Sequence, residues 1–181
     1  MVGATVRVLM LCGSLRAGST NAAALRTAAA IAGDGVDVVL FEGVRELPAF
    51  DTDDDHPPLP APVRALRDAV LDADALLIST PEYAGALPGA FKNALDWLIG
   101  EDRPGGLYEK PIGWLNTSAT GAPDAYASLV KVLGYAGARI VEGACAHVPV
   151  NGPMLDDDGL VADPALRAAI AAAVDALVAG S

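Results

Sequence analysis

Cysteine and histidine are scarce in this chain of 181 residues, which contains two of each. The cysteines, Cys12 and Cys145, lie in separate apolar stretches, so we expect free, buried thiols rather than a disulfide or a metal site. Long hydrophobic runs are also missing, because Gly, Pro or charged residues interrupt every apolar segment well before the roughly 20 residues of a membrane-spanning helix. The N-terminus lacks the basic start and cleavage site of a signal peptide, so we expect a cytoplasmic protein with no membrane partner.

Positive charge is in short supply as well. Only 12 Lys and Arg residues face 23 Asp and Glu residues, and the formal net charge is -11. A surface of this sign repels nucleic-acid backbones and anionic membranes, which excludes both as expected partners. An anionic ligand would need a local group of positive charges, so the position of each arginine is informative.

Apolar residues, by contrast, make up 52% of the chain, which is ample for a core. Short β-branched or apolar segments alternate with longer Ala/Leu-rich amphipathic segments, a pattern typical of βαβ units and a parallel sheet. Helices are predicted over Asn21 to Ala32, Pro62 to Asp72, Pro88 to Ile99, Asp124 to Tyr135 and Asp163 to Val178, where Asp163 is the expected N-cap. Strands are predicted over Thr5 to Cys12, Val36 to Phe41, Ala75 to Thr80, Pro111 to Thr117, and Ala138 to Glu142, with an extension to Val150 left open.

This strict alternation favours one domain over residues 1–181, built on a flavodoxin-like, doubly wound α/β sheet. We expect five parallel strands in the order 2-1-3-4-5 with helices on both faces, and the apolar first, third and fourth strands in the middle. Ligands of such sheets bind beyond the carboxyl ends of the strands, at the point where the strand order reverses. The loops after strands one, three and four are therefore the expected functional loops.

The first of these loops runs from Gly13 to Asn21 and has the composition of an anion site. Free backbone N–H groups at a helix start attract an anion, and glycines let the backbone approach it closely. The loop matches neither the dinucleotide fingerprint nor the Walker pattern. A plain polar turn, capped by Thr20 or Asn21 with Arg16 in solvent, would also fit. The loop contains two glycines. The groups expected to donate hydrogen bonds to a phosphate are the hydroxyls of Ser14, Ser19 and Thr20 and the guanidinium of Arg16.

The second loop makes the interpretation specific. After Thr80 the chain reads PEYAGALPGAFKNALDWL, from Pro81 to Leu98. Read together with Gly13-Ser14-Leu15-Arg16 and Ser19-Thr20-Asn21, this string resembles the NADPH-dependent FMN reductase family, which includes quinone, chromate and azo-dye reductases. The two motifs have the separation found in that family, and a looser likeness extends over nearly the full length.

The resemblance implies FMN as cofactor, with NADPH or NADH as co-substrate and a quinone, free flavin or another small molecule as electron acceptor. Chemistry would take place at the flavin N5, without a catalytic side chain or a metal. Backbone N–H groups near the ring would stabilise negative charge on the reduced flavin. The family commonly forms homodimers or homotetramers. The cofactor contacts implied are Ser14, Leu15, Arg16, Ala17, Gly18, Ser19, Thr20, Asn21, Pro81, Glu82, Tyr83, Ala84, Gly85, Thr117 and Ser118.

The chain departs from the family in two places. Ala84 stands where the family usually has Asn, which removes a side-chain contact but leaves main-chain binding intact. The third loop, from Asn116 to Asp124, offers the hydroxyls of Thr117 and Ser118, but it has fewer glycines than the family's loop and no following arginine. The second departure concerns the nicotinamide side of the site.

Other interpretations are open. An FMN-binding electron carrier or redox sensor would share the fold and the acidity, although such carriers typically lack an arginine like Arg16 in the phosphate loop. A hydrolase using Ser14 or Ser118 with one of the two histidines is disfavoured, because neither serine lies in a GxSxG elbow. The acidic segment from Leu47 to Pro62, with His56, is interpreted as a solvated loop rather than a metal site. An apolar patch around Trp97 on the third helix predicts self-association.

Overall fold

The computed structural model of the chain describes residues 5–181. A five-stranded, all-parallel sheet forms its centre, with the strand order β2-β1-β3-β4-β5. This confirms the predicted fold class and order. β5 continues beyond Glu142, in the direction of the longer alternative. The strands are β1 (Val6–Cys12), β2 (Val36–Phe41), β3 (Ala75–Ser79), β4 (Pro111–Asn116) and β5 (Arg139–His147).

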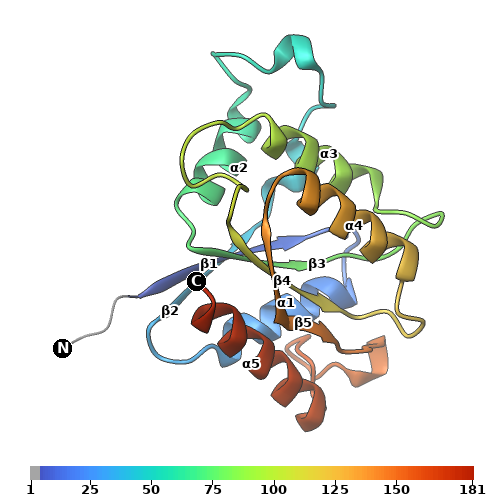
Figure 1. The fold of residues 1–181 in the computed structure, drawn as a ribbon. Helices are drawn as coiled ribbons and strands as arrows, with labels where there is room; N and C mark the ends of the chain where they lie inside the picture. The colour runs from blue at the N-terminus through green and yellow to red at the C-terminus, as the bar shows by residue number, and fades with distance from the viewer. Residues whose placement is uncertain (1–4) are drawn as a thin grey trace.

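Helices cover both faces of the sheet (Figure 1). One face carries α1 (Thr20–Ile31) and α5 (Pro164–Ala179). The other carries α2 (Ala61–Leu71), α3 (Gly89–Ile99) and α4 (Pro123–Tyr135). Each predicted helix boundary lies within one residue of the observed one. The prediction at α5 is confirmed in detail, because the Asp163 carboxylate accepts hydrogen bonds from the first-turn backbone N–H groups of Ala165 and Leu166.

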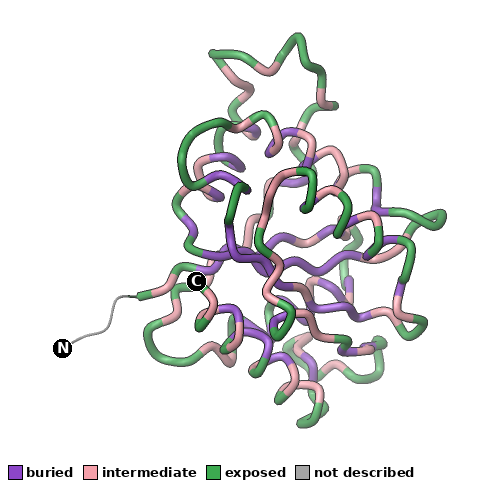
Figure 2. The backbone as a smooth tube through the Cα atoms, in the orientation of Figure 1, coloured by how far each residue is buried: buried purple, intermediate pink, exposed green. Residues whose placement is uncertain are grey.

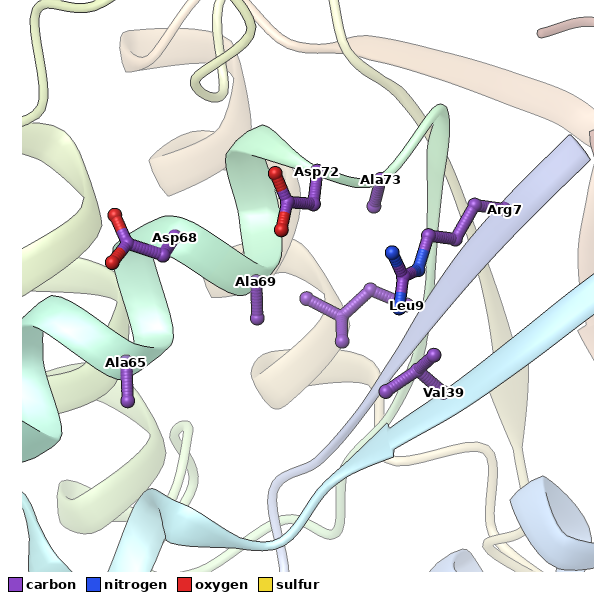
Figure 3. Close-up of a pocket in the computed structure, with 8 residues that line it drawn as sticks. All are labelled: Arg7, Leu9, Val39, Ala65, Asp68, Ala69, Asp72 and Ala73. Atoms are coloured by element: carbon purple, nitrogen blue, oxygen red, sulfur yellow. The ribbon is translucent and has the colours of Figure 1, made fainter.

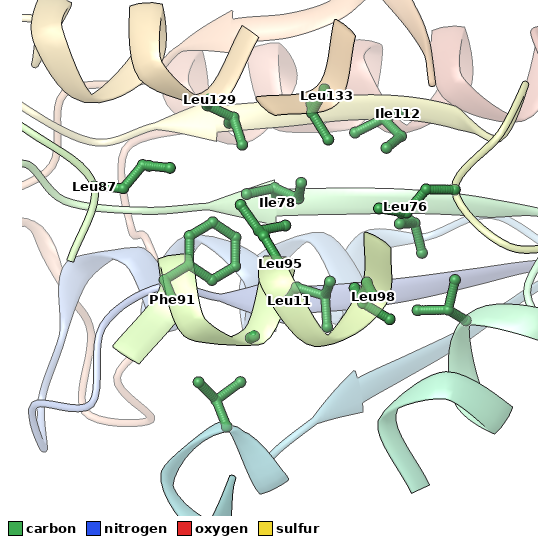
Figure 4. Close-up of a cluster of buried hydrophobic side chains, with 14 of the residues drawn as sticks. Leu11, Leu76, Ile78, Leu87, Phe91, Leu95, Leu98, Ile112, Leu129 and Leu133 are labelled. Carbon is green, nitrogen blue, oxygen red and sulfur yellow. The ribbon is translucent and has the colours of Figure 1, made fainter. Parts of the chain in front are cut away.

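Two apolar cores hold these layers together, one on each face of the sheet. Phe91 and Leu95 of α3 and Leu129 of α4 pack on Ile78 of β3 and Ile112 of β4 (Figure 4). The opposite core joins α1 and α5 to the same strands. Burial is concentrated along the central strands (Figure 2), and every residue of β3 is buried. This is the burial that the continuous apolar runs predicted.

The prediction of an apolar surface patch around Trp97 was wrong. Trp97 is fully buried, because the segment after η1 (Gly43–Glu46) folds over α3. The indole Nε1 donates to the carbonyl oxygen of Pro48 at 2.9 Å, and Phe50 packs edge-on against the Trp97 ring with centroids 5.0 Å apart. The tryptophan therefore anchors a loop and presents no face to a partner.

The acidic segment beyond Phe50 forms the loop that projects at the top of Figure 1. Most of its residues are exposed, as the interpretation as a solvated loop predicted. A buried ion pair anchors it, because the Asp55 carboxylate lies 2.7 Å from the guanidinium of Arg67 on α2. Across residues 5–181, no three or more His, Cys, Asp or Glu side chains gather in a group that could hold a metal ion. None of the helices in this range is long and apolar enough to cross a membrane.

Candidate functional site

Three loops meet beyond the carboxyl ends of β1, β3 and β4, at the right of Figure 1. They are residues 13–19, 80–88 and 117–122, and we call the place where they meet the three-loop edge. The backbone N–H of Gly13 donates to the carbonyl oxygen of Ser79 at 2.8 Å, which joins the first loop to the end of β3. The fold thus brings together the three segments that the sequence predicted, while the ligand contacts of their residues stay a prediction.

The first loop leaves the N-terminus of α1 open. Its N-cap is Ser19, not Thr20 or Asn21, and the Ser19 side chain makes no capping hydrogen bond within the described chain. No acidic residue lies in the first turn. The first-turn N–H groups of a helix have no partner inside the helix, so here they are available to an anion. Gly18, with a φ of +68°, gives the loop the left-handed turn that leads into this helix start.

Close packing fixes the position of this loop. A Cβ atom at Gly13 would lie 2.2 Å from Oγ1 of Thr80, a contact that excludes any side chain there. Arg16 is exposed, and its guanidinium lies 3.5 Å from the carbonyl oxygen of Gly18. No carboxylate of residues 5–181 forms a salt bridge with it. The arginine therefore lies next to the helix start without a counter-charge. An exposed, unpaired arginine also fits the interpretation of this loop as a plain polar turn. The contact between Arg16 and a phosphate therefore stays a prediction.

A hydrogen-bond network beneath the loops joins the first to the third. The Asn21 Oδ1 atom accepts from the hydroxyl of Ser79 at 2.9 Å and from that of Thr117 at 3.2 Å. The Thr117 and Thr20 hydroxyl oxygens are 3.2 Å apart. Asn21, Ser79 and Thr117 are all buried, so this network sets the spacing between the α1 start and the end of β4. Asn21 is thus a linking residue, a role that its sequence position did not suggest.

The second loop carries a tight turn at residues 83–86. Tyr83 and Ala86 exchange backbone hydrogen bonds of 3.0 and 3.1 Å, while Ala84 and Gly85 have φ values of 51° and 69°. Two successive positive φ values define a type I′ turn, in which Asn-Gly is the preferred pair. Ala84, which stands where the family usually has Asn, therefore adopts a left-handed conformation. Asn tolerates that conformation better than Ala, because its polar side chain can form local hydrogen bonds. The turn leaves the N–H groups of Ala84 and Gly85 unused.

Glu82 has a role that the sequence did not reveal. Its carboxylate accepts hydrogen bonds from the backbone N–H groups of Asp124 at 2.9 Å and Ala125 at 3.0 Å. It therefore caps α4, whose own N-cap residue is Ala122, a residue with no side-chain acceptor. This contact ties the second loop to the start of α4, directly after the third loop, across 42 residues of sequence.

The third loop is held from β5. His147 Nε2 lies 2.7 Å from the backbone oxygen of Ser118, and the Asn116 side chain binds both ends of the loop. The Ser118 hydroxyl pairs with that of Thr120. His56 contacts the carbonyl oxygen of Pro57. Neither histidine contacts a serine hydroxyl, so the structure contains no dyad of the hydrolase type among its described residues.

The thiols and the buried phenol near the three-loop edge are protonated at neutral pH. Burial raises the pKa of Cys145 to about 11 and also raises the pKa of Cys12. Burial is likewise the main reason that the pKa of Tyr126 is raised. Both cysteines are free, as predicted, but half-buried rather than fully buried. Neither provides the thiolate that nucleophilic catalysis would need.

A cavity elsewhere on the sheet does not compete for the ligand role. It has a volume of about 260 Å³ and lies under the second half of α2, between Ala65, Asp72 and the β1 residues Arg7 and Leu9 (Figure 3). Its lining residues Arg7 and Ala73 lie near the amino ends of β1 and β3. Ligands of doubly wound sheets bind at the opposite ends of the strands, where the three-loop edge lies.

An α/β sheet of this order with an open helix start beside its switch point defines a flavodoxin-like, mononucleotide-binding type of protein. The chain belongs to the NADPH-dependent FMN reductase family, whose sequence model matches residues 6–151. That match includes all three loops.

Individual relatives agree with this family. A quinone reductase of Escherichia coli is 38% identical over 118 residues, which are 64% of this chain and 61% of the relative. An NAD(P)H-dependent FMN reductase of Pseudomonas aeruginosa is 38% identical over 92 residues, 51% of this chain and 49% of the relative. The matched part thus spans less than two thirds of either protein.

A solved structure covers the chain more completely. It is FerB, a flavoenzyme NAD(P)H:(acceptor) oxidoreductase of Paracoccus denitrificans, with a TM-score of 0.82 and 28% identity. The similarity covers 96% of this chain and 98% of FerB. The likeness predicted from two short motifs therefore extends to the whole described fold.

Proposed function

We propose that this chain is an FMN-dependent NAD(P)H oxidoreductase that passes a hydride from NADPH or NADH, through the flavin, to a quinone, free flavin or another small acceptor. Family membership and the likeness to FerB support this activity. The observation that carries it is the uncapped N-terminus of α1, which lies at the same edge of the sheet as the exposed turn at residues 83–86. One group can bind a phosphate and the other a flat ring.

The residues present fit FMN. At the phosphate end, the α1 N–H groups and the loop hydroxyls would bind the anion, and Arg16 would neutralise its charge. FMN, when bound, accepts and releases the hydride at its N5, which is why no catalytic side chain is required. The chain's own contribution is to position, to shield and to stabilise charge. The residues that we assign to the cofactor are Ser14, Leu15, Arg16, Ala17, Gly18, Ser19, Thr20, Asn21, Pro81, Glu82, Tyr83, Ala84, Gly85, Thr117 and Ser118.

At the ring end, the turn supplies donors and an apolar surface. The N–H groups of Ala84 and Gly85 would donate to ring atoms where negative charge develops on reduction. Tyr83 is half exposed and would shield one edge of the ring from water. Glu82 acts through the backbone, because it holds this turn against the start of α4.

Anaerobic reduction tests the proposal. We expect NADPH or NADH to bleach the visible absorbance of the FMN-loaded protein, and a benzoquinone to restore it. Tight FMN binding without bleaching by either nucleotide would instead support an electron carrier or sensor. A protein that does not bind FMN would refute the site as well as the activity.

We further propose a homodimer or homotetramer, built from a single domain of residues 1–181 and located in the cytoplasm. The side chains of Tyr135 and Val130 on α4 are 82% and 43% exposed, and Tyr135 lines a hollow between α3 and α4. Burying them between copies would favour association. The shared central sheet supports one domain, and two free thiols are consistent with a reducing compartment. Light scattering on the purified protein measures the oligomeric state.

A further inference from the structure

A positively charged pocket lies between the first loop and the residues around the end of β2. It has a volume of about 280 Å³ and separates this loop from the segment that follows β2. Three guanidinium groups line it, from the first loop, from α1 and from η1. Leu40, Phe41 and Val44 form an apolar side. The three arginines are Arg16, Arg26 and Arg45.

This pocket borders the place assigned to the flavin, with which it shares residues 14–17 of the first loop, but Arg26 and Arg45 lie outside that place. Thr20 marks the side of α1 that faces the flavin loops, because its hydroxyl contacts that of Thr117 on the third loop. Ala22 and Arg26 are one helical turn apart on a different side of α1, and both line the pocket beside β2. The first loop therefore lies between the pocket and the third loop.

The arginines of the pocket have no acidic partner in the described structure. No carboxylate within residues 5–181 forms a salt bridge with Arg16, Arg26 or Arg45. Their hydrogen bonds go to neutral carbonyl oxygens, Arg26 to Gly159 at 3.4 Å and Arg45 to Leu15. Among the lining residues, Glu42 supplies the single carboxylate. Because Arg16 is assigned to the FMN phosphate, Arg26 and Arg45 remain against Glu42, which leaves a local positive excess on a chain whose net charge is -11.

We propose that this pocket binds the 2′-phosphate of NADPH, so that the chain prefers NADPH to NADH. The inference rests on the proposed reductase function and names the specificity site of that reaction. Guanidinium forks match the oxygens of a phosphate monoester, and this phosphate is the one group that distinguishes the two nucleotides. The first loop lines the pocket and also contributes to the proposed flavin site, so the two are neighbours.

Calorimetric titration of the oxidised, FMN-loaded protein with NADP⁺ and NAD⁺ tests this without turnover, because no hydride is available. We expect the wild type to bind NADP⁺ roughly ten-fold or more tightly than NAD⁺. Arg26→Gln and Arg45→Gln should each weaken NADP⁺ binding about ten-fold and leave NAD⁺ binding unchanged. Glu42→Gln should strengthen NADP⁺ binding. Arg64→Gln, which removes an exposed arginine of α2 outside this pocket, is the matched control and should change neither affinity.

Equal affinities of the wild type for NADP⁺ and NAD⁺ would overturn the inference, and so would arginine variants that lose both nucleotides equally. Because Arg45 also holds the loop at Leu15, the melting temperature and FMN affinity of each variant are measured alongside, and Arg45→Lys serves as a milder replacement. If NADPH and NADH bleach the flavin equally well, the pocket assignment fails while the reductase proposal stands. If neither nucleotide bleaches it, the reductase proposal itself fails.

Discussion

At the scale of single residues, substitution of Arg16 is the most direct test of the proposed phosphate site, and FMN affinity is the quantity to measure. Its guanidinium is exposed and contacts only the Gly18 carbonyl oxygen of its own loop, so removing it should leave folding unchanged. A charge-assisted hydrogen bond to phosphate contributes about 1.5–3 kcal/mol, so Arg16→Ala should weaken FMN binding roughly ten- to a hundred-fold. Quenching of FMN fluorescence on titration with apoprotein measures the affinity.

The control for Arg16→Ala is Arg64→Ala, which removes the same charge at an exposed position on α2. It should bind FMN as the wild type does. If both variants bind FMN with wild-type affinity, Arg16 is a solvent arginine and the polar-turn interpretation of the first loop is correct.

The backbone conformation of Ala84 leads to a prediction about the stability of the protein. Its φ of 51° costs an alanine about 1 kcal/mol, and Asn relieves much of that cost through local hydrogen bonding. Ala84→Asn should therefore raise the free energy of unfolding by about 0.5–1 kcal/mol, an increase of a few degrees in melting temperature. Ala86→Asn, at an exposed position of the same turn without a positive φ, should have no such effect. A melting temperature lowered by Ala84→Asn would show that the turn is not of type I′.

At the scale of elements, the contact between Glu82 and α4 predicts that one side chain couples two loops. Glu82→Ala removes the acceptor of two backbone N–H groups at a helix start, and should destabilise the protein by about 1–2 kcal/mol. Glu82→Gln keeps an acceptor oxygen without the charge and should have an intermediate effect. Chemical denaturation measures both changes.

FMN affinity provides a second measurement on the same variants. Because Glu82 holds the turn at residues 83–86 against the start of α4, Glu82→Ala should also weaken FMN binding. Glu142→Ala, which removes an exposed carboxylate of β5, is the control and should change neither property. Unchanged stability and affinity in Glu82→Ala would mean that solvent caps α4 equally well.

The elements themselves were predictable because their signals are local. Apolar runs identified the buried strands, and the Asp163-Pro164 pair marked the start of α5. The burial of Trp97 was not predictable in this way. Its cover comes from Pro48 and Phe50, almost 50 residues earlier in the chain, and no periodicity within α3 records that contact.

At the scale of the whole molecule, the same distinction separates what the sequence showed of the site from what it did not. Each loop could be assigned from its own composition and from the parallel-sheet rule that strand ends meet. The links between the loops could not, because Asn21 meets Thr117 and Glu82 meets Asp124 across long sequence separations. The arginine pocket was missed for the same reason. Arg26 and Arg45 come together only when α1 and η1 pack on either side of the first loop.

The charge distribution of the whole chain leads to a final prediction, in which salt has opposite effects on stability and on binding. The net charge of -11 makes the folded state repel itself, and added salt screens this repulsion. Raising NaCl from about 0.05 to about 0.5 M shortens the Debye length from above about 10 Å to well below it, which should raise the melting temperature of the apoprotein by a few degrees.

FMN and NADP⁺ should respond in the opposite direction over the same range of salt. Their phosphates are assigned to arginines that stand against an acidic background, so screening removes attraction rather than repulsion. Calorimetry should show both affinities falling as salt rises, while riboflavin, which lacks the phosphate, should bind with an affinity nearly independent of salt. If FMN instead binds more tightly as salt rises, in parallel with stability, its affinity is set by repulsion from the acidic chain as a whole. Local positive charge at the first loop would then not determine FMN affinity.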